Sequence, residues 1–194
     1  MFDASSLGFR PAFAMLAPIG QRPAGIVAKE CFGRHLAIVE ARKGGDAQFA
    51  EQFLAQFGVS PSTGPRCISS SRIALLGLRP SRWLAIATSA EAQIIEPLER
   101  AVAGCASLID QTDGLALLRI NGSRVRNVFA KGLPIDLADG SFAIGDVAVS
   151  AIAHIGVTVW RLDDAFEIAV QRSYAGAFAQ WLREAAAEFG LEVA

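Results

Sequence analysis

The chain has 194 residues, of which 52% are hydrophobic and 19% are charged, and its formal net charge is −1. This length allows one large domain or two small halves that share a core, and the apolar content is ample for that core. The arginines are scattered along the chain and not clustered with aromatic residues. This argues against nucleic-acid binding, because phosphate contacts need concentrated positive charge.

The first 30 residues contain three prolines and several glycines, and we expect residues 1–30 to form an extended N-terminal arm. A short apolar run after Arg10 resembles the core of a signal peptide. However, Asp3 precedes this run, prolines bracket it, and no cleavage site of small residues follows it. We therefore predict a cytoplasmic protein whose single α+β domain spans residues 31–194.

The number and spacing of the cysteines also favour the cytoplasm. The three cysteines, Cys31, Cys67 and Cys105, are widely spaced, which suits free thiols in a reducing compartment better than a disulfide framework. The longest apolar stretch, residues 147–160, is short and is interrupted by a histidine and a glycine. No membrane-spanning segment is therefore predicted.

The first half of the domain is expected to span residues 31–105. Its predicted strands lie at residues 34–40, 73–78 and 83–87. A helix is expected from Asp46 to Gly58, and its buried face is predicted to carry Phe49, Phe53, Leu54 and Phe57. A loop rich in serine, proline and glycine follows, at residues 59–71. A second helix is expected from a capping box at Thr88 and Glu91 to Gly104, with a kink at Pro97.

The second half is expected to span residues 106–194. Its predicted strands lie at residues 107–111, 115–120, 147–153, 157–161 and 166–170. A short helix is predicted after Ser123, where Lys131 lies near its C-terminal end and Gly132 ends it. A long apolar stripe predicts a final helix from Ser173 to Gly190.

Each half thus contains a strand, a helix, several strands and another helix. Consecutive strands between helices favour antiparallel pairing, so we predict an α+β fold with mainly antiparallel sheets. The two similar halves, about residues 31–105 and 106–194, are expected to share one core by exchanging strands. No sequence repeat is visible, so this duplication rests on the order of the elements alone.

Residues that carry chemistry are sparse. The two histidines, His35 and His154, show no ligand spacing with each other or with cysteine, so no metal site is predicted. Trp83, Trp160 and Trp181 are expected in the core or as anchors of a subunit contact. The sequence lacks the glycine-rich loops that bind NAD, FAD or ATP and the Gly-x-Ser-x-Gly elbow of hydrolases. No catalytic residue is predicted.

Asp136 is the one candidate ligand-binding residue. It lies among apolar residues in the segment 134–137, just after the helix that Gly132 ends. An aspartate in such a place usually caps a turn by accepting backbone N–H groups, and this interpretation is favoured. The alternative is that its carboxylate holds a pterin or an amine.

Three ordered motifs resemble the gamma subunit of heterotetrameric sarcosine oxidase. In residues 115–136, a strand, a glycine and a helix precede Lys131-Gly-Leu-Pro-Ile-Asp136, which is similar to the family's Lys-Gly-x-Pro-x-Asp pattern. Residues 76–84 resemble its Leu-Gly-x-x-Pro-x-x-Trp-Leu segment, and residues 166–182 match its C-terminal pattern. The resemblance covers about residues 70–190 and departs from the family at Leu133, where a cysteine is frequent.

The resemblance implies a fold like the folate-binding domain of aminomethyltransferases. It also implies membership of a cytoplasmic complex that oxidatively demethylates sarcosine to glycine and passes the one-carbon unit to tetrahydrofolate. The implied partners are the alpha, beta and delta subunits, which would carry FAD, FMN, NAD and tetrahydrofolate. This chain would be a non-catalytic accessory subunit, inactive alone, and in isolation its uncovered interface could produce a homodimer.

Two alternatives stay open. The same accessory role could serve a complex that acts on another N-methylated amine, such as N-methylglutamate. The chain could instead be a stand-alone folate-binding or methyl-transfer protein that uses Asp136.

Overall fold

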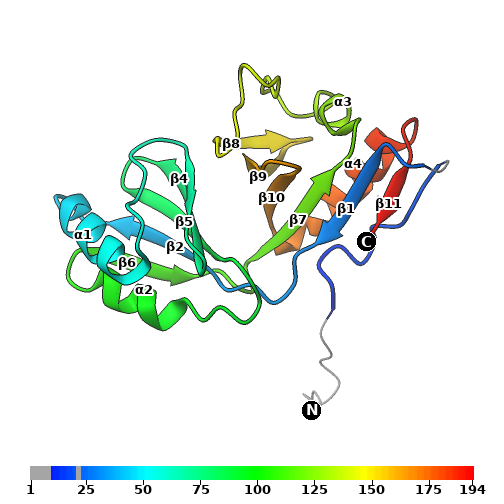
Figure 1. Ribbon diagram of the computed structural model, residues 1–194. Coiled ribbons are helices and arrows are strands. Elements are labelled where there is room, and N and C mark those ends of the chain that lie inside the picture. The colour runs from blue at the N-terminus through cyan, green and yellow to red at the C-terminus, as the bar shows by residue number, and fades with distance from the viewer. Residues whose placement is uncertain (1–9, 21–22) are drawn as a thin grey trace, which may run out of the picture.

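The computed structural model describes residues 10–20 and 23–194, which form two β-sheets with helices on their outer faces (Figure 1). The strands are β1 (Ile26–Glu30), β2 (Leu36–Ala41), β3 (Cys67–Ser69), β4 (Ile73–Arg79), β5 (Arg82–Ala87), β6 (Ala106–Asp110), β7 (Leu115–Asn121), β8 (Val147–Ile152), β9 (Ile155–Arg161), β10 (Phe166–Gln171) and β11 (Leu191–Val193). The helices are α1 (Asp46–Phe57), α2 (Ile95–Val102), α3 (Val125–Phe129) and α4 (Ala175–Ala186), and a 3-10 turn at Arg172–Tyr174 leads into α4.

The order of the elements repeats once along the chain. Two strands, a helix, three strands and a helix make up β1–β2–α1–β3–β4–β5–α2, and the same series recurs as β6–β7–α3–β8–β9–β10–α4. The first strand of each series pairs with the other series: β1 lies beside β7, and β6 lies beside β2. The two units therefore exchange their first strands. An exchange of strands was expected, but between halves that span residues 31–105 and 106–194, and β1 lies outside the first of these ranges.

The resulting sheets have matching strand orders. The five-stranded sheet runs β3-β4-β5-β2-β6, and the six-stranded sheet runs β8-β9-β10-β7-β1-β11. All the described ladder pairs are antiparallel except β1 with β11. The predicted α+β fold class with mainly antiparallel sheets is confirmed.

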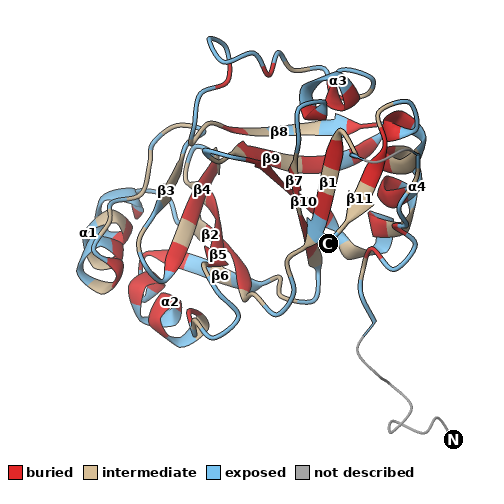
Figure 2. Cartoon of the chain, turned by 45° about the vertical axis from the view of Figure 1, so that its right-hand side comes forward, coloured by how far each residue is buried: buried red, intermediate tan, exposed pale blue. Residues whose placement is uncertain are grey.

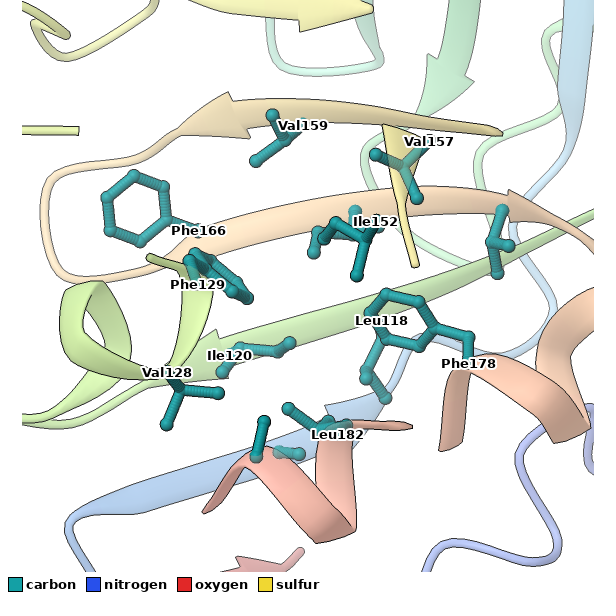
Figure 3. Packing of buried hydrophobic residues seen from close by; sticks show 14 of the residues in the cluster. Leu118, Ile120, Val128, Phe129, Ile152, Val157, Val159, Phe166, Phe178 and Leu182 are labelled. Carbon is teal, nitrogen blue, oxygen red and sulfur yellow. The ribbon is translucent and has the colours of Figure 1, made fainter. Parts of the chain in front are cut away.

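The two sheets pack face to face, and each carries its own helices on its outer face, which gives four layers. Figure 2 shows buried residues concentrated on the strands and on the inward sides of the helices. One apolar cluster lies between the six-stranded sheet and α3 and α4, a second between the five-stranded sheet and α1 and α2, and a third between the sheets. Figure 3 shows the first cluster, in which Phe166 on β10 faces Phe129 of α3, and Phe178 and Leu182 of α4 lie below Leu118.

Strand alternation explains this layering. On β10, Phe166, Ile168 and Val170 belong to the helix-side cluster, whereas Ala169 belongs to the cluster between the sheets. Successive side chains of a strand point to opposite faces, and both faces of β10 are covered. Its sequence is therefore almost continuously apolar, as is typical of a strand buried on two sides.

The N-terminal segment differs from the extended arm predicted for residues 1–30. Residues 26–30 form β1 in the interior of the six-stranded sheet, where Ile26 is completely buried. Upstream, the Glu30 carboxylate accepts the backbone N–H groups of Ala12 at 2.8 Å and Phe13 at 3.1 Å, and Phe13 is buried in the core. The apolar positions in this segment thus dock it onto the domain. Residues 1–9 and 21–22 lie outside the described part of the chain.

The second predicted helix also differs, because α2 begins at Ile95 and not near Thr88. Pro97 falls in the first turn of α2, where a missing N–H costs no intrahelical hydrogen bond, so no kink arises. In α1, Leu54 is 47% exposed and is not part of the buried face. The loop predicted at residues 59–71 contains the short strand β3.

Candidate functional site

The loop after α3, which carries the Lys-Gly-x-Pro-x-Asp motif, connects α3 to the end of α4. Lys131 Nζ donates a hydrogen bond to the carbonyl oxygen of Ala185 at 2.6 Å and forms an ion pair with Glu188. The ammonium group also lies 4.9 Å from the centroid of the Phe189 ring. Lys131 therefore caps the C-terminal end of α4, whereas the sequence had placed it at the end of its own helix.

Gly132 and Leu133, the next two residues of the motif, also contribute to the packing of this region. A Cβ at Gly132 would lie 2.8 Å from the Trp181 ring, so only glycine lets the loop approach α4 this closely. Leu133, the one position at which the motif was expected to differ from its relatives, is 4% exposed in the helix-side core. A surface hollow of about 470 Å³ lies here and is lined in part by Pro134, His154 and Trp181.

Asp136 ends the motif and holds the following turn together. Its Oδ1 accepts the backbone N–H of Ala138 at 2.9 Å, and its Oδ2 accepts the hydroxyl of Ser141 at 2.6 Å. These bonds, that of Ser141 first, hold the pKa of the exposed Asp136 carboxyl below its usual value. Both carboxylate oxygens are thus engaged within their own loop, which is the geometry of a turn cap. A ligand-binding role for Asp136 stays a prediction.

The Asp136→Ala substitution should lower stability modestly and in a pH-dependent way. The folded-state pKa is lowered, so the carboxylate stabilises the fold above the ordinary aspartate range. That contribution is lost as the pH falls through the folded pKa. Urea unfolding should therefore distinguish variant from wild type at pH 7 and give converging midpoints at strongly acidic pH. A difference independent of pH would mean that the carboxylate charge has no part in the turn.

A second polar group lies between the two sheets. The Glu167 side chain lies on the face of β10 that points toward the other sheet, and Glu167 is 4% exposed. Its carboxylate accepts a hydrogen bond from Arg34 Nη1 at 3.4 Å, and the two side chains form an ion pair. Arg34 comes from the β1–β2 connection, which crosses from one sheet to the other. The Cys31 thiol lies 3.9 Å from the same carboxylate. The pair therefore holds the crossing connection against the six-stranded sheet.

The sheets are also joined where β3 meets the start of β8. Cys67 N–H donates to the carbonyl oxygen of Gly145 at 2.7 Å, and Val147 N–H donates to that of Pro65 at 2.8 Å. Arg66 and Asp146 form an ion pair across the same contact. These bonds form a bridge at the start of β3 and connect the five-stranded sheet to β8.

A small cavity lies where the two exchanged connections meet. Its volume is about 100 Å³, and Cys31, Arg34, Thr112, Asp113 and Arg172 contribute to its lining. Sites for drug-sized ligands usually occupy about 300–1,000 Å³, so this space suits a few waters and not a folate. The cavity belongs to the packing of the seam between the sheets.

The thiols of this seam are strongly protonated. Burial first, and then the negative charge of Glu167, raise the pKa of Cys67 to about 11 from the ordinary value of 9.0. The same two causes, in the same order, raise the pKa of Cys31. Since the thiolate is the reactive form, both thiols should be inert near neutral pH.

Stability should therefore fall at alkaline pH. Below pH 9 the Cys67 thiol is protonated in both folded and unfolded chains; between about 9 and 11 only the unfolded chain releases the proton. Stability is thus lost over this window, by about 2 kcal/mol at pH 11 from this thiol. Urea unfolding of wild type and Cys67→Ala at pH 8 and pH 10.5 measures the difference, and parallel declines would contradict the raised pKa.

The remaining candidate residues are not brought together into a site. His35 lies in the β1–β2 connection and His154 in the β8–β9 turn, with a backbone φ of 69°. Within residues 10–20 and 23–194, no group of three or more histidine, cysteine, aspartate or glutamate side chains could hold a metal ion. None of the helices in these ranges has the length and apolar character needed to span a bilayer.

Comparison with solved structures identifies the class of fold. A chain of the heterotetrameric sarcosine oxidase from Corynebacterium sp. U-96, solved in complex with pyrrole 2-carboxylate, matches with a TM-score of 0.80 and 22% identity, over 93% of this chain and 96% of that one. The glycine cleavage system aminomethyltransferase T from Bartonella henselae matches with a TM-score of 0.63 and 20% identity. That match covers 88% of this chain and 48% of the aminomethyltransferase. The chain thus has an aminomethyltransferase-like α+β fold.

The family follows from the sequence match. Residues 42–188 match the sarcosine oxidase gamma subunit family, and the chain belongs to that family. No curated protein matches the chain significantly. The matched range includes the Lys131–Asp136 loop, the contact between β3 and β8, and Glu167, whereas Arg34 lies outside it.

Proposed function

We propose that this chain is the gamma-type accessory subunit of a sarcosine-oxidase-like complex in the cytoplasm. The observation that carries this proposal is the family match over residues 42–188. The proposed complex oxidatively demethylates sarcosine to glycine and passes the one-carbon unit to tetrahydrofolate. The fold match over 93% of the chain to a sarcosine oxidase chain supports it.

The proposed partners are alpha, beta and delta subunits, and FAD, FMN, NAD and tetrahydrofolate would be bound by them. The geometry of this chain supports a packing role, because its motif residues hold α3 against α4 and its buried ion pair holds the β1–β2 connection against the six-stranded sheet. Several large apolar side chains are exposed and available to partners. They include Met15, Leu54, Ile109, Ile144 and Tyr174.

The test is recovery of the affinity-tagged chain from its native cells, followed by the visible absorbance spectrum and subunit ratio of the eluate. We expect large flavin-containing partners in a fixed ratio and sarcosine turnover by the eluate. The purified chain alone should be colourless and inactive on sarcosine. Sarcosine turnover by the chain alone, or recovery of the chain without partners, would overturn the proposal.

The same preparation separates the alternatives. Turnover of N-methylglutamate in preference to sarcosine by the recovered complex would assign the accessory role to another N-methylated amine. Saturable binding of tetrahydrofolate to the isolated chain, lost in Asp136→Ala, would support a stand-alone folate-binding protein. Both carboxylate oxygens of Asp136 already accept hydrogen bonds within their own loop, and this argues against folate binding at Asp136.

A further inference from the structure

Strand β6 ends the five-stranded sheet, and one of its edges has no partner strand among the described residues. Gln111 N–H donates to the carbonyl oxygen of Leu36 at 2.8 Å, and Arg42 N–H donates to that of Cys105 at 2.8 Å. Residues of an antiparallel strand alternate between facing the partner and facing away. Residues 105, 107, 109 and 111 therefore face β2, and Leu108 turns its N–H and C=O groups to the free edge.

The internal repeat shows how the corresponding edge is used elsewhere in the same molecule. Strand β1 is the counterpart of β6, since each is the first strand of its unit and each lies antiparallel beside the second strand of the other unit. On β1 the outer edge is occupied by β11, which runs parallel to it. Ile26 N–H donates to the carbonyl oxygen of Gly190 at 3.2 Å, and Ala194 N–H donates to that of Ala28 at 3.0 Å.

The occupant of the β1 edge has a simple pattern. Leu191 is 2% exposed and Val193 packs on the same core, so both face the helix layer, while Glu192 between them faces the other way. Through the repeat, Ile26 and Ala28 of β1 correspond to Ala106 and Leu108 of β6. Ala106 and Leu108 likewise face the helix layer of their own sheet. The β6 edge therefore offers the backbone groups and the apolar side that β11 uses on β1.

The one charged residue of β6 is Asp110 at its end, whose carboxylate accepts the N–H of Thr112. The strand reads Ala-Ser-Leu-Ile-Asp, without the lysine or proline that usually blocks an exposed edge, and its register with β2 contains no bulge. Ile109, on its inner face, is 48% exposed. The edge of β3, by contrast, is bridged at its start, where Cys67 N–H donates to the carbonyl oxygen of Gly145 and Val147 N–H donates to that of Pro65.

We propose that the free edge of β6 binds an extended segment of a partner polypeptide, which adds as a parallel strand and directs alternate apolar side chains toward α1 and α2. This proposal rests on the proposed function, because it requires that the chain has partner subunits. Strand addition of this kind draws affinity from main-chain hydrogen bonds and specificity from alternate side chains. A second copy related by a two-fold axis would pair β6 antiparallel to itself, unlike β11 on β1, so a partner polypeptide is favoured.

The test compares the full-length chain alone with the complex recovered through its tag, by hydrogen–deuterium exchange. The amides of Leu108 and Asp110 should exchange at least about tenfold more slowly in the complex. Leu108→Pro removes the outward N–H without breaking a bond to β2, as edge strands tolerate, and should reduce recovery of partners by about tenfold or more. Val149→Pro is the control for loss of an outward N–H on an edge strand, because Val149 also faces away from its neighbour, on the edge of β8, and is 59% exposed. Leu108→Ala, which removes the side chain and keeps the N–H, is the control for lost packing on the helix side.

Photocrosslinkers at positions 107 and 109 test the orientation. They should react with partner residues in ascending sequence order, as a parallel strand requires. Partners recovered in fixed ratio with Leu108 and Asp110 unprotected would overturn the docking strand while leaving the accessory role intact. So would equal losses in Leu108→Pro and Val149→Pro, or protection that rises with the concentration of the isolated chain. Recovery of the chain without partners would overturn both proposals.

Discussion

Gly45→Ala and Gly122→Ala are each expected to lower the free energy of unfolding by about 3 kcal/mol or more. A Cβ at Gly45 would collide with the carbonyl oxygen of Cys105, and one at Gly122 with that of Gly25. Cys105 immediately precedes β6, and Gly25 immediately precedes β1. Each glycine thus packs closely against the residue that precedes the strand contributed by the other unit. Neither backbone segment can move without displacing that exchanged strand.

The two sites differ in a way that separates steric from conformational effects. Gly122 has a φ of 122°, which L side chains rarely adopt, whereas Gly45 has a φ of −86° that any residue tolerates. Gly44→Ala isolates the conformational cost, because Gly44 has a φ of 79° and no atom within 4 Å of an added Cβ. It should cost about 1 kcal/mol, and Gly140→Ala, with open space and no positive φ, should cost almost nothing.

Urea unfolding of these four variants, followed by tryptophan fluorescence, gives the comparison. The predicted order of stability loss is Gly122, Gly45, Gly44 and Gly140, from largest to smallest. A Gly45→Ala protein as stable as Gly44→Ala would show that the segment before β6 adjusts freely, and that the strand exchange is not tightly held at this point.

The strands were predictable because their apolar residues alternate or run continuously between turn residues, as in β4, β5 and β10. The repeated element order suggested that the two halves exchange strands, but it did not indicate which strands. Strand β1 itself was missed, because the prolines and glycines around it indicated an extended arm. Its burial depends on β7 and β11, which lie about a hundred or more residues away in sequence, and no local pattern reports such pairing.

The residues of the candidate site also divide into those that the local sequence predicts and those that depend on distant partners. The motif at Lys131–Asp136 was recognisable, and the local role of Asp136 as a turn cap follows from its neighbours. The partner of Lys131 was not predictable, because Ala185 lies 54 residues further along the chain. Glu167 carried a visible signal, a lone acid in an otherwise apolar strand, yet its partner Arg34 is 133 residues away. Sequence spacing can mark such a residue as unusual but cannot name what neutralises it.

Glu167→Ala should lower the free energy of unfolding by about 2–3 kcal/mol. Removing one member of a buried pair leaves the other charge uncompensated, and Arg34 retains 20% side-chain exposure, which places the cost below that of a fully buried pair. The double substitution Glu167→Leu with Arg34→Met should recover much of this loss, because apolar residues of similar volume need no partner. A coupling energy of about 1–2 kcal/mol is expected from the double-mutant cycle.

The Glu167→Gln variant tests whether the negative charge of Glu167 matters in addition to its volume. The charge of Glu167 is the second cause of the raised pKa of Cys67, after burial, so its removal should lower that pKa part of the way from about 11 toward 9.0. Cys31 should shift in the same direction. Rates of iodoacetamide alkylation between pH 8 and pH 11 measure both thiols, and Asp163→Asn provides a carboxylate control outside the seam. Unchanged thiol titration with a full loss of stability would assign Glu167 a packing role, whereas both effects together would show that its negative charge acts on both thiols and stabilises the seam between the sheets.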